Sequence, residues 1–419
     1  MCIRDSIKLV ENIHRNFIWD KKRPNIKHST LIGDYARGGL KDVDISSKFK
    51  SLHLNWLRRL FDENFHPWKQ LPLYYFQTLS KPSNLFHPNL SISNEQIRHI
   101  PIFYQRMVKY WQEISQFQPT TASLVLSESL CFNSHIKIDG RPINPSFINA
   151  NKYVALADLF ANNGHLITWE VASVRLNITN YFKWIQIANS IPSSWKKIVS
   201  GSLHTEDICL IQHLNIKDKA VAVSELDSKS FYTLFIDKIY SKPSSQKYFE
   251  RLYGPLNWKS IYLLPRLTTM DSATRIFQYK ILHNTLFLKS RLYHLGYSND
   301  SYCSLCGNFD ETPVHFFCNC VVTMSLWNSF CNLLRPYLVL EPLSPQSAIL
   351  GIFLENDKHH LLKNHLLLLF KHCVYKYRMD NINFHTIVGK IKSTSKIEKQ
   401  ILSADKFNKK WEIIMPILY

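Results

Sequence analysis

Glycine is scarce in this sequence, with 11 glycines among 419 residues. That is about 2.6%, against roughly 7% in an average soluble protein. Doubly wound nucleotide-binding folds need glycine at phosphate loops and tight turns. The sequence also lacks the patterns G-x-x-x-x-G-K-[ST], G-x-G-x-x-G and H-E-x-x-H. These absences argue against a nucleotide-binding α/β fold and favour a mainly α-helical chain.

Motifs that would carry catalysis are also missing. No two aspartates are adjacent, so a polymerase-type [FY]-x-D-D motif is absent, and no G-x-S-x-G elbow occurs. Two-metal catalysis needs several convergent carboxylates, and no motif unites the acids of this chain. We therefore expect no catalytic residues and no enzyme activity of its own. Nucleotide incorporation by the purified chain would refute this expectation.

Long apolar runs are absent as well. The strongest run, Leu366 to Phe370, has five residues, whereas a membrane span needs about 20. We interpret this run as the buried face of a helix. The N-terminus lacks the apolar core of a signal peptide, and no lipidation motif occurs. We therefore expect an intracellular protein with no membrane partner, whose nine cysteines are reduced and available for a metal.

Acidic residues are too few to balance the basic ones. Lys and Arg number 51 and Asp and Glu 32, which gives a net charge of +19. An acidic partner is implied, and nucleic acid is the usual one. Residues 356–419 carry 12 basic and 5 acidic residues, a local charge of +7. This basic tail is either a solvated helix face or a nucleic-acid contact surface.

The length suggests two to four compact units, at roughly 100–200 residues each. We divide the chain into residues 1–119, 120–245, 246–345 and 346–419. Residues 120–134 look like a linker, and the polar turn at 241–245 is a plausible boundary. The first six residues precede an amphipathic segment that has no start signal of its own. We suspect that they are a translated join and expect the natural chain to extend upstream.

Helical periodicity of apolar residues recurs along the chain. We predict helices over the following segments: 7–18, 47–60, 101–117, 154–161, 228–240, 271–284, 288–295, 324–334, 358–378 and 384–403. Residues 135–143 contain an Asp-Gly turn and predict a small β-hairpin. The expected fold is mainly α, with several helical subdomains, a small zinc-stabilised Cys3His module and at most a short β-hairpin.

The helix over 47–60 places Phe49, Leu52, Trp56 and Leu60 on one face, which we expect to be buried. Arg58 and Arg59 lie largely off that face. These arginines belong either to an ordinary solvated surface or to a surface that contacts phosphates.

One cluster of residues predicts a metal site. Cys303 and Cys306 form a C-x2-C pair, from which two thiolates can bind one metal at a tight turn. His315 and either Cys320 or Cys318 could complete a tetrahedron. Cys3His is a structural zinc set without an open position for water, so Zn²⁺ is the expected cofactor. Nearby, His283 and His294 are expected on helix surfaces.

The residues around this cluster are similar to the zinc-binding region of reverse transcriptases from LINE-type, non-LTR retrotransposons. The resemblance runs through Phe277–Asn284, Cys303–Gly307, Glu311–Thr312, His315–Phe317, Cys320 and Trp327. The family pattern is C-x2-C-G, an acidic-Thr step, H-x-F and C-x6-W. In this pattern the distances in sequence from the histidine to the last cysteine and from that cysteine to the tryptophan match His315, Cys320 and Trp327. The resemblance therefore selects Cys320 over Cys318 as the fourth ligand.

The resemblance extends more weakly upstream, through Asn16–Trp19, Gly38–Leu40 and Trp56–Leu60. It implies a C-terminal piece of the reverse transcriptase polyprotein. Residues 1–119 would be thumb-like helices after a missing polymerase palm, residues 120–245 a connecting region, residues 246–345 the zinc-binding domain and residues 346–419 a basic tail. The motifs of the palm and of the endonuclease are not present here.

The resemblance implies a non-catalytic fragment that binds template RNA, target DNA or both during target-primed reverse transcription. Its partners would be element RNA, target DNA and the upstream polymerase and endonuclease domains. The implied localisation is the nucleus and a cytoplasmic ribonucleoprotein. An alternative is a free-standing, zinc-stabilised DNA-binding or regulatory protein derived from such an element. Candidate phosphate-contacting residues, beside Arg58 and Arg59, are Lys280, Lys289 and Arg291.

Overall fold

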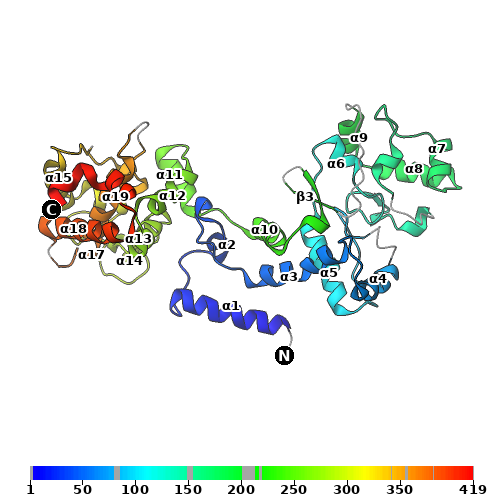
Figure 1. The fold of residues 1–419 in the computed structure, drawn as a ribbon, viewed down its shortest axis with the longest axis horizontal. Helices are drawn as coiled ribbons and strands as arrows, with labels where there is room; N and C mark the ends of the chain where they lie inside the picture. Colours follow the sequence, from blue (N-terminus) through cyan, green and yellow to red (C-terminus); the bar gives the residue numbers. More distant parts are fainter. Residues whose placement is uncertain are drawn as a thin grey trace. The chain divides into compact units, whose positions relative to one another are not determined.

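A computed structural model gives the fold of the chain (Figure 1). It describes residues 3–79, 85–148, 154–200, 213–216, 219–340, 342–353, 357–380 and 382–418. Helices dominate the described residues, and the sheets are two short antiparallel pairs. The mainly α fold class is therefore confirmed. The chain forms two compact units, one of Met1–Glu11 with Asp44–Ile239 and one of Asn12–Val43 with Tyr240–Tyr419.

Helix α1, Ile3–Trp19, contains residues of both units. The other helices and 3₁₀ turns described in the first unit are α3 Ile45–Leu60, η2 Pro67–Lys69, α4 Gln70–Gln77, α5 Ile102–Ser115, α6 Ala122–Leu126, η4 Pro145–Ile148, η5 Leu156–Leu159, α7 Trp169–Arg175, α8 Tyr181–Ser190, α9 Ser193–Ser200, η6 Val223–Glu225 and α10 Ser228–Ile239. Its strands are β1 Lys137–Ile138, β2 Arg141–Pro142, β3 His213–Ile216 and β4 Lys219–Ala222.

Helix α3 packs against α5 and α10 in the first unit (Figure 1). The Asp44 side chain caps it by accepting a hydrogen bond from the backbone N–H of Ser47 (2.7 Å). Its buried face carries Leu54, Leu57 and Leu60. The expected face was wrong in part, because Leu52 and Trp56 are exposed. The apolar stripe of this helix is wider than one packing surface, and sequence periodicity could not tell which part is covered.

The β-hairpin expected over 135–143 forms, with Ile138 paired to Arg141 across the Asp-Gly turn. The second hairpin, β3 with β4, was not predicted. The helix expected over 154–161 is replaced by the 3₁₀ turn η5. That segment is too short for stable α-helix, and Ser129 forms a β-bridge to Ala155 beside it.

The linker expected over 120–134 is wrong. Residues 122–126 form α6, and the apolar side chains of this stretch are buried, including Val125, Leu130 and Phe132. Polar side chains made the stretch look like a linker, but they are bonded internally. Asn133, for example, donates to the buried carboxylate of Glu128 (2.8 Å). Hydrogen bonds give buried polar side chains partners in place of the water that they leave.

The second unit contains the following helices and turns: α2 His28–Leu31, η1 Tyr35–Arg37, α11 Ser244–Tyr253, α12 Trp258–Thr268, α13 Ser272–Leu282, α14 Lys289–His294, η7 His315–Asn319, α15 Val321–Leu334, α16 Pro345–Leu350, α17 His360–Lys376, α18 Phe384–Ile401, α19 Ala404–Trp411, η8 Glu412–Ile414 and α20 Met415–Leu418. The helices expected over 271–284, 288–295, 324–334, 358–378 and 384–403 are confirmed within a few residues. None of the described helices has the length and hydropathy that a membrane span requires.

Residues 12–43 belong to the second unit, although the segment 44–239 separates them from the rest of it in sequence. The Tyr240 hydroxyl donates to the backbone oxygen of Arg37 (2.6 Å), and the Tyr279 hydroxyl donates to that of Gly38 (3.2 Å). The four-part division of the chain is finer than these two units, and it stays a prediction.

Helix α17 packs against α12, α13 and α18 in the second unit (Figure 1). The run Leu366 to Phe370 is buried at every position, so it covers all sides of the helix rather than one face. Lys371 follows this run and is 1% exposed. Its Nζ donates to Gln278 Oε1 (2.8 Å) and to the backbone oxygen of Ala348 (2.7 Å). Burial lowers the pKa of Lys371 to about 7.

This buried lysine predicts a pH-dependent stability. Its pKa is about 7 in the folded state and near 10.4 when unfolded. Between these values the unfolded chain binds a proton that the folded chain does not, so the free energy of unfolding rises with pH, by at most about 1.4 kcal/mol per pH unit. The substitution Lys371→Met should remove this rise.

The midpoints of thermal unfolding of the wild type and the variant, recorded from pH 6 to 9 at a fixed zinc concentration, measure the pH dependence. The exposed Lys376→Met on the same helix should keep the wild-type slope, and an unchanged slope in Lys371→Met would contradict the prediction.

Candidate metal centre

Four side chains from two short segments of the second unit converge on one point. They are Cys303, Cys306, His315 and Cys320, and their ligand atoms all lie within 4.8 Å of one another. Cys303 and Cys320 are buried, His315 is 9% exposed, and Cys306 is partly exposed. The structure thus brings together the four residues that the sequence pattern selects.

The first two cysteines lie on a tight loop. The backbone N–H of Cys303 donates to the backbone oxygen of Phe309 (2.7 Å), and that of Gly307 donates back to Cys303 (2.8 Å). Gly307 has φ +74°, a left-handed conformation that glycine adopts without strain. This turn directs the Cys303 and Cys306 side chains to the same side of the loop.

The other two ligands flank the short turn η7. The backbone N–H of Cys320 donates to the backbone oxygen of His315 (2.7 Å), five residues earlier. This wide turn keeps the imidazole and the thiol on one side of the chain. Phe316 and Phe317, between them, are fully buried and anchor the turn in the core. Cys320 is also the N-cap residue of α15, so its sulfur lies at the positive end of that helix.

The spacing of the ligand atoms fits tetrahedral zinc. Zn–S bonds of about 2.3 Å and a Zn–N bond of about 2.0 Å place neighbouring sulfurs about 3.8 Å apart, and sulfur and nitrogen about 3.6 Å apart. Cys303 Sγ and Cys320 Sγ are 3.9 Å apart, and Cys306 Sγ and His315 Nε2 are 3.3 Å apart. Three thiols and an imidazole are a donor set that zinc prefers, and they would hold the ion as a closed, structural site.

The local electrostatics favour a thiolate at Cys320. The Cys303 thiol donates to the Cys320 sulfur, and backbone N–H groups of Val322 and Thr323 at the start of α15 add further hydrogen bonds. Together they lower the pKa of the Cys320 thiol below its ordinary value. Metal ligation by cysteine requires thiolates, so this environment prepares one ligand for the ion.

Cys318 lies outside the cluster. Its sulfur hydrogen-bonds the backbone oxygen of Leu343 (3.1 Å), and burial raises the pKa of the thiol. Cys318 lies within η7 and Cys320 directly follows this turn, so the two side chains, two residues apart, point to different sides. Cys320 is therefore the cysteine that the geometry selects as fourth ligand.

The buried carboxylate of Glu311 holds the module together, a role that residue patterns alone did not indicate. One oxygen accepts from the backbone N–H of Lys289 at the start of α14 (3.0 Å). The other accepts from the backbone N–H of Ser304 (2.6 Å) and from the Ser304 hydroxyl. Ser304 lies between the two cysteines of the loop. Glu311 therefore ties the metal-binding loop to a neighbouring helix.

The three basic candidates beside the module differ in their surroundings. Lys280 is exposed on α13. Lys289 is paired with Asp300 (3.2 Å), which neutralises much of its charge. Arg291 is partly buried and donates to the backbone oxygen of Asn284. His294 is exposed as expected, whereas His283 is buried, with its ring 4.1 Å from that of Tyr279. Nucleic-acid contact by these residues stays a prediction.

Arg58 and Arg59 lie at the end of α3 in the first unit. Arg59 is exposed, and its guanidinium is 5.3 Å from the centroid of the Trp56 ring. Trp56 in turn contacts Trp68 and Phe103 edge to face, and the three rings line an open hollow of about 330 Å³. An arginine beside exposed aromatic rings is typical of surfaces that bind single-stranded nucleic acid.

Comparison with known proteins identifies the region around the cluster. Residues 257–327 match the family of the zinc-binding region in reverse transcriptase. The match contains α12, α13, α14, the four clustered residues and the start of α15. No curated protein matches the chain. A reverse-transcriptase zinc-binding region is therefore present in this chain, and a metal-ligating cluster lies within it.

The geometry predicts one equivalent of zinc per chain, bound by the four clustered residues. Cys303→Ser and Cys320→Ser should lose the ion, because each replaces a buried thiolate with a weaker ligand. Cys318→Ser is the matched control and should keep it. Metal analysis of the three purified variants measures the molar ratio of zinc to protein. If Cys318→Ser lost zinc while Cys320→Ser kept it, the assignment of the fourth ligand would be wrong.

Glu311→Ala should weaken zinc binding without removing a ligand. It leaves the partly buried N–H groups of Lys289 and Ser304 without their carboxylate acceptor and frees the metal-binding loop. Loss of such an outer partner lowers metal affinity by about 10- to 100-fold. Competition with a chromophoric chelator measures the affinity. The substitution Asp310→Ala, one residue earlier at an exposed position, should change it much less.

Proposed function

We propose that this chain is a nucleic-acid-binding, non-catalytic part of a reverse transcriptase. It would hold template RNA, target DNA or both while a separate polymerase domain primes synthesis at nicked DNA. The single observation that carries the proposal is the Cys3His cluster inside a region that matches the reverse-transcriptase zinc-binding family. The net charge of +19 supports a polyanionic partner.

The four clustered residues would contribute stability rather than chemistry. With all four positions of a tetrahedron filled by protein, no position is open for water or substrate. Binding energy of such a site is folding energy for the loops around it. Lys280 on α13 and the end of α14 lie at the surface of the same matched region, where basic side chains can contact phosphates.

The first unit supports the same function by different means. Arg59, Trp56, Trp68 and Phe103 form an exposed aromatic and cationic surface. Aromatic rings can stack on unpaired bases while the arginine neutralises a phosphate. The partners proposed for the chain are element RNA, target DNA and the polymerase and endonuclease domains of the same polyprotein. The proposed locations are the nucleus and a cytoplasmic ribonucleoprotein.

Fluorescence anisotropy of the full chain with labelled RNA and DNA tests this function. Counterion release gives a slope of log affinity against log salt of about −0.7 per contacted phosphate on a single strand. We expect a slope of about −3 or steeper, which corresponds to at least four contacts. A flat salt dependence, or no binding at low salt, would refute the proposal. A strong preference for one duplex sequence would favour the alternative of a free-standing DNA-binding regulator.

Single substitutions beside the zinc module should differ according to their ion pairing. Lys280→Gln removes an exposed, available charge and should reduce the salt slope by about 0.7. Lys289→Gln removes a lysine that Asp300 already neutralises, so its slope should change less. Equal effects of the two substitutions would show that the ion pair does not govern phosphate contact.

A further inference from the structure

A basic pocket lies in the second unit, away from the four clustered residues. Its volume is about 350 Å³, within the range of small-ligand sites. Four separate segments line it: the end of α12, the residues before and at the start of α17, the end of α18, and α19. Segments distant in sequence meet here, so neither periodicity nor a motif could have indicated it.

Cations dominate one side of the pocket. Lys358, Lys406 and Lys409 line it and are exposed. Among the residues that the structure describes, no acid lies within ion-pair distance of any of the three. Arg266 also lines the pocket, but its guanidinium is stacked 3.5 Å from the centroid of the Tyr35 ring, which lines a neighbouring hollow. The three lysines around this hollow attract an anion.

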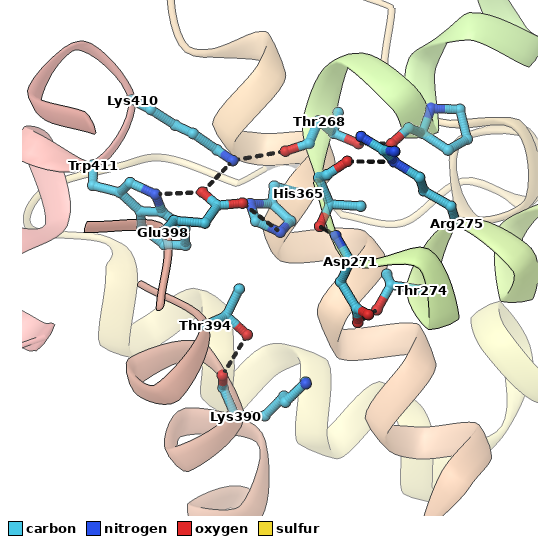
Figure 2. Close-up of polar contacts among 12 residues, drawn as sticks. Thr268, Asp271, Thr274, Arg275, His365, Lys390, Thr394, Glu398, Lys410 and Trp411 are labelled. Atoms are coloured by element: carbon cyan, nitrogen blue, oxygen red, sulfur yellow. Dashed lines mark hydrogen bonds and ion pairs between the residues drawn. The ribbon is translucent and has the colours of Figure 1, made fainter. Parts of the chain in front are cut away.

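The acid in the pocket does not cancel this charge. Glu398 is 3% exposed, and one carboxylate oxygen accepts from Lys410 Nζ (2.7 Å) and from Trp411 Nε1 (2.9 Å), as Figure 2 shows. Lys410 also donates to the backbone oxygen of Thr268 (2.7 Å). Glu398 and Lys410 therefore neutralise each other and connect α18, α19 and the end of α12. Asp357, next to Lys358, is likewise paired, with Lys363 (2.9 Å).

Hydrogen bonds from residues of α13 hold the wall that is formed by the end of α12. Arg275 on α13 donates through Nε to the backbone oxygen of Thr269 (2.6 Å) and through Nη2 to that of Arg266 (3.3 Å). Asp271 caps α13 and accepts from the Thr274 hydroxyl (2.5 Å) in the same turn (Figure 2). These bonds fix the chain over 266–271, so this wall of the pocket exists before any ligand arrives. Preorganised sites lose less entropy on binding.

The rest of the lining is mixed, with Thr268, Thr269 and His359 beside a group of apolar side chains. Leu267 and Met270 are at least half exposed, and Leu361 and Leu402 complete this surface. A free phosphate would leave it uncovered. A nucleotide of a single strand would use both features, with its phosphate at the lysines and its unstacked base against the apolar side chains. In a duplex the bases are stacked and paired, and they cannot reach such a wall.

We propose that this pocket, which we call the Lys358–Lys409 pocket, binds one nucleotide of a single-stranded nucleic acid. The inference rests on the proposed nucleic-acid-binding function and adds the place and the strandedness of the contact. The three lysines would contact the phosphates, and Leu267 and Met270 would contact the base.

The double variant Lys406→Gln/Lys409→Gln tests the phosphate contacts. Both side chains are exposed, so the fold should survive, which circular dichroism and zinc content would verify. Two lost contacts reduce the salt slope for a 12-nucleotide single strand by about 1.4, or about 25-fold in affinity at 0.1 M salt. The matched control is Lys247→Gln/Lys259→Gln, which removes the same charge from exposed sites of the same unit that do not line the pocket.

Leu267→Ser/Met270→Ser tests the base contact. It should weaken single-strand binding about fivefold through lost apolar contact and leave the salt slope unchanged. Binding of a blunt duplex of equal length should change little in this variant. Each of these results supports the proposed contact between the base and the apolar wall of the pocket.

Three outcomes would overturn the proposal. If the pocket lysine variant and the control lysine variant lost the same affinity for the single strand, only the overall charge of the protein would matter. If Leu267→Ser/Met270→Ser weakened single-strand and duplex binding equally, the proposed base contact would be refuted. Tight binding of a free nucleoside monophosphate, with oligonucleotide affinity unchanged by the pocket variants, would make this a mononucleotide site instead. If the wild-type chain bound no nucleic acid at any salt, the proposed function itself would fail, which is distinguishable from failure of the pocket alone.

Discussion

The convergence of three thiols and one imidazole within 4.8 Å is the constraint on which the second unit depends. Buried polar groups need partners, and a cluster of cysteine ligands is satisfied best by a shared cation. The loop of Cys303 and Cys306, the wide turn η7 and the start of α15 together bring these four atoms to the common point. The Glu311 carboxylate then fixes that loop to α14 by hydrogen bonds to backbone N–H groups.

The core of the unit forms around this cluster. Phe316 and Phe317, which lie between two of the ligands, are fully buried. The Phe317 ring contacts Phe277 on α13, and Lys371 on α17 lies 6.0 Å from the centroid of Phe317. Loss of the metal would therefore disturb packing well beyond the ligands. The same architecture carries α18 and α19, whose lysines surround the Lys358–Lys409 pocket.

Basic and apolar side chains occur together in both units, but they are arranged differently. In the first unit, Arg59 lies beside exposed indole and phenyl rings. In the second, lysines surround a hollow with an aliphatic wall. Both arrangements combine charge for phosphates with apolar surface for bases, which suits an unpaired strand better than a duplex.

The sequence by itself determined the helical class, the positions of most long helices and the four clustered residues, because periodicity, caps and ligand spacing are local properties. It could not determine which side of the apolar stripe on α3 is covered, or that residues 120–134 enter a core, because burial depends on partners elsewhere in the chain. The role of Glu311, the buried Lys371 and the Lys358–Lys409 pocket were decided only by the tertiary structure. Each depends on side chains that are distant in sequence, and no local pattern records which segments will meet.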